Sequence, residues 1–168
     1  MRVSAKVDYA LRAVAHIAAD SDRGPVKAEA IARVHQIPPR FLLSILTELK
    51  HARLLRSQRG SEGGYTLSRP ATEITLADIM RAVDGPLANV HETRLGELGY
   101  AHSVEALEEV WRAVRSSLRS VLEGVTVADV VAGTLPAKVV RLAEQYRAQE
   151  AAASLADGRR GGDRRQAV

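Results

Sequence analysis

The sequence predicts a mainly α-helical protein with a small β-hairpin wing, that is, a winged helix-turn-helix domain followed by a long dimerisation helix. Two segments carry this prediction. Residues 38–67 join a helix with one apolar stripe to a glycine-rich hairpin, and residues 103–123 hold apolar side chains at alternating spacings of three and four. We expect a winged helix-turn-helix domain at 1–86, a sensor-type loop at 87–102, a dimerisation helix and C-terminal helices at 103–156, and a disordered basic tail at 157–168.

The first two helices are predicted from capping residues and apolar spacing. Ser4 is suited to cap a helix that runs to about Ala19. Turn-forming residues at 20–25 separate this helix from a second one at about 27–34. A short turn through Gln36 and Ile37 then leads into the next helix. Two helices joined by so short a turn indicate a helix-turn-helix.

The helix that follows the turn is predicted to be the recognition helix. Its apolar residues repeat at i, i+3, i+4 and i+7; they are Leu42, Ile45, Leu46 and Leu49. The prolines at 38 and 39 stand at the helix start, where no N–H partner is needed. At about 100° per residue, the opposite face carries Arg40, Ser44, Thr47 and His51, with Lys50 at its flank. We expect this face to enter the DNA major groove.

A glycine-rich hairpin follows the recognition helix directly. Residues 54–59 and 65–68 are predicted as two short strands. Gly60, Gly63 and Gly64 are expected to supply the positive φ angles of the turn and to belong to the DNA-binding residues of the wing. Arg59 stands at the base of this wing, where its charge would meet phosphates or a narrow minor groove. Arg56 lies on the same strand and either shares that role or is a solvated strand arginine.

Further elements follow the wing. Thr75 and Asp78 form a capping-box-like start to a short helix that ends near residues 84–86, and residues 86–102 have no clean period and are expected to form a loop. Thr126 and Asp129 start another short helix, and Pro136 opens the last one. The Gly/Arg-rich end is expected to be disordered; it either adds non-specific DNA affinity or is a solubilising tail.

The segment 103–123 contains an apolar seam with the 3.5-residue period of a heptad repeat. We call this set the α-seam; its members are Val104, Leu107, Trp111, Val114, Leu118 and Val121. A seam this regular, outside the winged helix, indicates a partner helix from a second subunit. The alternative is a core helix of a monomer.

Composition and charge limit the classes of function. The chain of 168 residues has no cysteine, which excludes disulfides, thiolate zinc sites and cysteine-held iron–sulfur clusters. Its apolar runs are too short to span a bilayer, so we expect a cytoplasmic protein without a membrane partner. Residues 1–70 carry 12 Lys and Arg against 6 Asp and Glu, whereas residues 71–157 carry 8 against 13. This asymmetry indicates that the N-terminal segment faces a polyanion; the alternative is an ordinary solvated surface.

The residues do not favour an enzyme. The glycine-rich segment 60–64 lacks the Lys-Ser/Thr of a phosphate-binding loop and lies between strands rather than before a helix. The histidines and serines show no triad context.

Several stretches together resemble a known family. They are residues 1–6, 9–11, 24–26, 31–32, 37–38, 42, 45–46 and 49, the wing residues 59–60 and 63–67, and residues 74–79 and 83–87. The chain is similar to the bacterial winged-helix transcription regulators typified by IscR, NsrR and CymR, closely over 1–87 and more loosely to about 131. The resemblance implies a homodimer, crossed by the helix at 103–123, that binds an inverted-repeat operator in double-stranded DNA, with repression the expected sign.

The resemblance also assigns candidate DNA contacts. Arg40, Leu43 and Ser44 match the family's base-contacting positions, and Arg59 matches the wing arginine. Leu43 departs from the polar residues common there; it would touch a thymine methyl group but donates no hydrogen bond. Glu62 is a second departure, because an acid at the wing tip repels phosphate.

The sensor loop departs most from the family. Glu92, Leu98 and Val104 stand where cluster-binding members carry cysteines, so we expect no cofactor. Nitrogen and oxygen ligands for a metal ion would come from Asp8, His91, Glu92 and His102. The spacing of these residues matches no compact metal-binding motif. The alternatives for the signal are a metabolite or a metal that acts through the loop 87–102, a partner protein, and unregulated repression. The alternative to a DNA-binding regulator is a winged-helix protein-interaction module without a specific DNA site.

Overall fold

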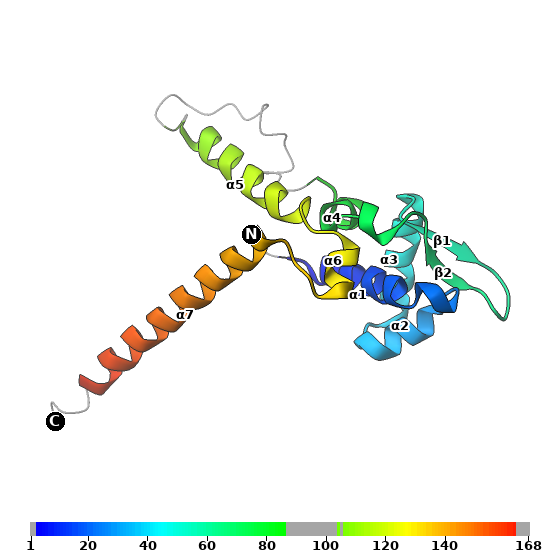
Figure 1. The fold of residues 1–168 in the computed structure, drawn as a ribbon, viewed down its shortest axis with the longest axis horizontal. Coiled ribbons are helices and arrows are strands. Elements are labelled where there is room, and N and C mark those ends of the chain that lie inside the picture. The colour runs from blue at the N-terminus through cyan, green and yellow to red at the C-terminus, as the bar shows by residue number, and fades with distance from the viewer. Residues whose placement is uncertain (1–2, 87–103, 105, 164–168) are drawn as a thin grey trace. The chain divides into compact units, whose positions relative to one another are not determined.

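The computed structural model of the chain describes residues 3–86, 104 and 106–163, with side chains described as far as residue 154. Its helices are α1 (Ala5–Ala19), α2 (Ala28–His35), α3 (Pro39–His51), α4 (Leu76–Asp84), α5 (Ala106–Leu122), α6 (Val127–Ala132) and α7 (Ala137–Asp163), with 3₁₀ turns η1 (Ser21–Arg23) and η2 (Ala71–Glu73) and strands β1 (Leu55–Gln58) and β2 (Gly64–Leu67). These elements belong to two compact units, Met1–Thr134 and Leu135–Val168. Helices with one two-stranded hairpin in the described residues (Figure 1) confirm the predicted fold class.

Helix α1 lies at the centre of the first unit because one of its faces is apolar throughout. Ser4 caps the helix as predicted, and its hydroxyl oxygen accepts a hydrogen bond from the Val7 N–H at 3.1 Å. The buried residues of α1 are Val7, Ala10, Ala13, Val14, Ile17 and Ala18. This face packs against α3, α4 and α6, and the alanines allow those helices to approach closely.

The predicted helix-turn-helix is formed by α2 and α3. Gln36 ends α2 in the left-handed region at φ 54°, and Ile37 anchors the turn with 2% of its surface exposed. The predicted stripe of α3 is completely buried, with Leu42, Ile45, Leu46 and Leu49 at 0% exposure. Burying side chains of this kind contributes roughly 1.5 to 3 kcal/mol each, so the stripe fixes which face of α3 points outward.

Strands β1 and β2 form the antiparallel wing, in a register that pairs Leu55 with Leu67 and Gln58 with Gly64. Strand β1 is one residue shorter at each end than the predicted 54–59, whereas β2 has the predicted length and lies one residue earlier than 65–68. The wing is tied to the segment before α2 because Val26 and Tyr65 exchange two backbone hydrogen bonds, at 2.9 and 2.8 Å. This isolated antiparallel β-bridge pairs the backbone of Val26 with β2 of the hairpin.

The glycines of the wing serve two different purposes, and this corrects the prediction that each supplies a positive φ. Only Gly60 of the three has a positive φ, at 109°. Gly63 and Gly64 are needed for close approach: an added Cβ would lie 2.4 Å from the Gln58 carbonyl oxygen at Gly63 and 2.6 Å from the Val26 carbonyl oxygen at Gly64.

Helices α4 and α6 begin with the same local structure, and the two starts are joined. Thr75 with Asp78 and Thr126 with Asp129 form complete capping boxes, which confirms both predicted starts. The Leu76 N–H donates to the Val125 carbonyl oxygen at 3.0 Å. Helix α6 also packs against α1, so the chain that follows α5 returns to the core of the first unit.

Helix α7 differs from its predicted bounds, and the start of α5 is not tested. Helix α5 is described from Ala106 to Leu122, whereas its predicted start at Ser103 and the predicted loop at 87–102 lie outside the described residues. Helix α7 continues to Asp163, through residues 157–163, where the composition predicts disorder. The alanine-rich run 151–153 favours helix up to this segment, but the three glycines within 157–163 do not, and helix propensity leaves the extension unexplained. No helix of the described ranges has the length and apolar character needed to cross a membrane.

The wing geometry predicts that Gly64→Ala is destabilising. The new Cβ would force apart the backbones of Gly64 and Val26, and we expect the free energy of unfolding to fall by about 1 to 3 kcal/mol. Ser61→Ala, at the exposed turn, is the matched control and should change it by less than about 0.5 kcal/mol. Urea unfolding followed by circular dichroism measures both, and equal stability of the two variants would contradict the close approach.

Candidate DNA-binding surface

The outward face of α3 brings together the candidate base-reading residues. The structure exposes all six predicted side chains: Arg40, Leu43, Ser44, Thr47, Lys50 and His51. Leu43 is 47% exposed although it is a large apolar residue. The face therefore combines cationic, hydroxyl and aliphatic groups on one helix surface whose opposite side is core.

Thr47 has an intrahelical hydrogen bond that the sequence did not predict. Its hydroxyl donates to the carbonyl oxygen of Leu43 at 2.8 Å. A threonine hydroxyl has one hydrogen and two lone pairs. With the hydrogen used inside the helix, Thr47 presents only acceptor capacity outward, which suits an exocyclic amino group of cytosine or adenine.

The two wing arginines have different surroundings. The Arg56 guanidinium donates to the carbonyl oxygen of Ser68 at 3.1 Å, so this side chain braces the hairpin against the chain that leaves it. Arg59 follows β1 at the exposed turn, and no hydrogen bond or ion pair holds it among the described residues. Glu62 is also exposed in that turn. Arg59 is thus the better placed of the two arginines to reach an anion.

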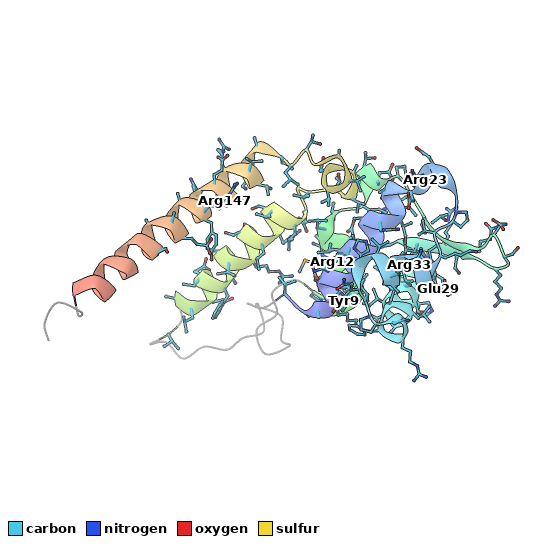
Figure 2. The ribbon with its side chains drawn as sticks, turned by 90° about the horizontal axis from the view of Figure 1, so that it is seen from below. Tyr9, Arg12, Arg23, Glu29, Arg33 and Arg147 are labelled. Carbon is cyan, nitrogen blue, oxygen red and sulfur yellow. The ribbon has the colours of Figure 1, made fainter. Side chains whose placement is uncertain are left out.

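Polar and aromatic contacts fix α3 against α1. The Lys6 ammonium group lies 2.8 Å from the Glu48 carboxylate and also donates to the Val83 carbonyl oxygen at 2.6 Å. The rings of Tyr9 and Phe41 meet edge to face, with centroids 5.9 Å apart. The Arg12 guanidinium lies 5.9 Å from the Tyr9 ring centroid, and Figure 2 labels both residues on α1. These contacts hold the start and the end of the recognition helix in place.

The α-seam is partly exposed in the described part of the protomer. Val104, Leu107 and Val114 are 40 to 42% exposed, and no described residue of α5 is buried. The remaining members, Trp111, Leu118 and Val121, are half-buried. Val110, at 50% exposure, adds to the exposed apolar area of this helix.

The candidate metal ligands are not gathered in the described part of the molecule. The Asp8 carboxylate lies 2.5 Å from the Arg12 guanidinium, whereas His91, Glu92 and His102 are outside the described residues. Among residues 3–86, 104 and 106–163, no group of three His, Asp or Glu side chains is placed to hold a metal ion.

The sequence analysis missed a pair of histidines at the junction of α1 and α2. Nδ1 of His16 lies 3.1 Å from Nε2 of His35, and Nε2 of His16 lies 3.5 Å from the Asp20 carboxylate. Burial, followed by the nearby His16 and Arg12, lowers the pKa of His35 below its ordinary value. The only signal in the sequence was a histidine in the last turn of each of two adjacent helices.

Comparison with known proteins defines the class of protein to which this chain belongs. Residues 3–133 match the Rrf2 family, described as an iron-dependent transcriptional regulator. The chain therefore belongs to the Rrf2 family of winged-helix, DNA-binding transcriptional regulators, which are not enzymes. This confirms the resemblance found in the sequence.

Individual relatives agree with this assignment. The chain is 53% identical over 150 residues to the Mycobacterium tuberculosis protein named "Putative HTH-type transcriptional regulator Rv1287". This match covers 89% of the chain and 93% of the relative. The structure of CymR, the global cysteine regulator of Bacillus subtilis, is similar with a TM-score of 0.68 and 27% identity, covering 80% of this chain and 98% of CymR. The T. potens IscR structure has a TM-score of 0.66 and 30% identity, covering 79% and 88%.

The description of the family implies that its members depend on iron, which raises the question of whether the residues of this chain fit an iron site. A thiolate-held cluster does not fit, because the chain contains no cysteine. Asp8, the non-cysteine ligand that the resemblance suggests, has its carboxylate paired with Arg12. We therefore derive no function through an iron–sulfur cluster.

The histidine pair predicts an acid-sensitive contribution to stability. Because the pKa of His35 is lower in the folded protein than its ordinary value of 6.5, the unfolded chain binds a proton there at higher pH than the folded protein does. The free energy of unfolding should therefore fall as the pH drops from about 7.5 to about 5.5, and His35→Gln should flatten this slope. His51→Gln, a change on the exposed face of α3, is the matched control. Urea titrations at several pH values that give His35→Gln the wild-type slope would contradict this account.

Proposed function

We propose that this protein is a homodimeric, cytoplasmic repressor that binds an inverted-repeat operator without an iron–sulfur cluster. The observation that carries the proposal is the outward face of α3, held by a fully buried stripe and flanked by the wing arginine. Such a face suits the major groove, where side chains read base edges, while Arg59 anchors the wing on phosphates or the minor groove.

The charge distribution supports DNA as the partner. Residues 1–70, which contain α3 and the wing, carry an excess of six positive charges, from 12 Lys and Arg against 6 Asp and Glu. An excess on the segment that presents the recognition helix attracts the phosphate backbone and positions the reading face. A protein-interaction module without a DNA site has no comparable observation in its favour.

The α-seam supports the dimer. Its apolar side chains stand exposed or half-exposed on a helix with charged residues elsewhere, including Arg112 paired with Glu108 at 2.5 Å. Two such seams from two copies would bury each other, as in a coiled coil. A two-fold dimer presents two recognition helices about 34 Å apart, which corresponds to half-sites about one helical turn apart.

The first prediction distinguishes reading from anchoring on DNA. Arg40→Ala should cost about 1 to 3 kcal/mol on the operator and relax the preference at one base pair per half-site, because a guanidinium there takes both acceptors of a guanine. Arg59→Ala should weaken binding and reduce the salt slope by about one unit per subunit. Arg147→Ala, which removes the same charge from α7, is the control.

Fluorescence anisotropy with the protein's own upstream region and with scrambled DNA, at several salt concentrations, measures these effects. If Arg40→Ala weakened binding to all DNA equally while Arg59→Ala left affinity and salt slope unchanged, the proposed docking would be wrong. Equal affinity of the wild type for both DNAs would favour the protein-interaction module.

The second prediction concerns assembly. Trp111→Asp places a charge in the α-seam and should dissociate the dimer at micromolar concentration, because an unpaired carboxylate is costly to bury. Ser116→Asp, on the opposite, exposed side of α5, should leave the dimer intact. Light scattering reports the mass of each, and a monomeric wild type would reject the proposal.

A further inference from the structure

A cavity of about 490 Å³ opens on the first unit, and none of the candidate DNA-binding residues lines it. It lies between α1, the last residue of α2, the start of α4, and α6. Its walls are largely aliphatic and include Leu11, Ala15, Leu76, Val127, Val130 and Val131. The volume falls within the range of roughly 300 to 1,000 Å³ that is typical of small-molecule sites.

The polar groups of the cavity come from its α1 and α2 walls, and they are mainly cationic or protonatable. Arg12 and His16 stand one turn apart on α1, and His35 meets His16 from α2 at 3.1 Å. Each of these two α1 side chains has one acidic neighbour. The Asp8 carboxylate lies 2.5 Å from Arg12, and the Asp20 carboxylate lies 3.5 Å from His16. Arginine has five N–H donors in a fork, so one carboxylate does not use its whole hydrogen-bonding capacity.

An apolar hollow with convergent polar groups is the usual form of a ligand site. Val130 and Val131 at the cavity are 40% and 44% exposed, so aliphatic surface here faces solvent in the protomer. A ligand that matches this lining needs an apolar body and one anionic group. A cationic or strongly polar ligand would meet aliphatic walls and like charge.

We propose that this cavity binds a small monocarboxylate, whose apolar body packs on the leucine and valine walls and whose carboxylate accepts hydrogen bonds from Arg12 and the His16–His35 pair, and that this binding regulates the affinity for DNA. Binding of the carboxylate is independent of the proposed function, whereas its regulatory effect rests on it.

The path from the cavity to the recognition helix is short. His35 is the last residue of α2, Gln36 forms the left-handed turn, and α3 begins at Pro39. A carboxylate shared by α1 and His35 changes how α2 is held against α1, and the turn transmits that change to α3. The two sites are therefore coupled through one helix-turn-helix junction, and the effect on DNA affinity is set by how differently the ligand binds the two arrangements.

The binding test uses the full-length chain with its leucine and valine methyl groups labelled for NMR. The probes are hexanoate and phenylacetate, compared with hexanamide and phenylacetamide, which have the same shape without the charge. We expect methyl shifts at Leu11, Leu76 and Val127, with the acids binding about tenfold more tightly than the amides, since hydrogen bonds to a charged group are the stronger ones.

Variants locate the site. Arg12→Gln keeps most of the side chain and should weaken binding of the acids while leaving that of the amides unchanged. Arg33→Gln, which removes the same charge from the exposed part of α2 outside the cavity, should bind both as the wild type does (Figure 2). Equal affinity for acids and amides, methyl shifts confined to other regions, or no shift with any probe at millimolar concentration would each overturn the proposed site.

The regulatory test repeats the DNA titration with saturating phenylacetate. We expect the Kd for operator DNA to change at least about fivefold in the wild type and to stay constant in Arg12→Gln. An unchanged Kd in the wild type, with the methyl shifts present, would overturn the regulatory half alone. If no specific DNA binding occurs with or without the probe while the methyl shifts are present, the proposed function fails and the carboxylate site stands.

Discussion

The burial of one stripe of α3 against α1 is the constraint on which the functional surface depends. Four aliphatic side chains of α3 are completely removed from solvent, and they face the alanine-rich side of α1 and the residues of α4. Because a helix turns by about 100° per residue, burying Leu42, Ile45, Leu46 and Leu49 leaves no freedom in which residues point outward. Arg40 and its neighbours are thus presented by the hydrophobic core rather than by contacts of their own. The ion pair of Lys6 with Glu48 and the Tyr9–Phe41 contact then fix the helix along its length.

The same helix α1 connects the other features of the first unit. One side supports α3, and its remaining surface meets α4 and α6, which are joined by backbone hydrogen bonds at their starts. The cavity with Arg12 and the histidine pair lies along α1 as well. A change at this helix therefore has a direct route to the recognition helix through packed side chains, without any need for a change in the wing. In a dimer joined through α5, the return of the chain through α6 would link the α-seam to the same core.

Local signals in the sequence predicted most of this fold, and the exceptions have physical reasons. Caps at Ser4, Thr75 and Thr126 and the stripe of α3 depend on residues within a few positions of one another, so spacing alone identifies them. Gly64 could not be explained in the same way, because its neighbour Val26 is distant in the chain and only the folded backbone shows the close approach. The His16–His35 pair was missed for the same reason. The six side chains predicted for the outward face of α3 are exposed, yet the hydrogen bond that uses the Thr47 hydroxyl hydrogen could be seen only in the coordinates.

The central claim is that two copies of the chain hold two α3 helices in a two-fold arrangement suited to DNA. The most direct measurement is selection of bound sequences from a random DNA pool by the full-length wild-type protein, followed by sequencing of the enriched pool. The account predicts enriched inverted repeats whose half-sites are separated by about one helical turn, 10 to 10.5 base pairs centre to centre. Enrichment of single half-sites, of direct repeats, or of no sequence at all would contradict it.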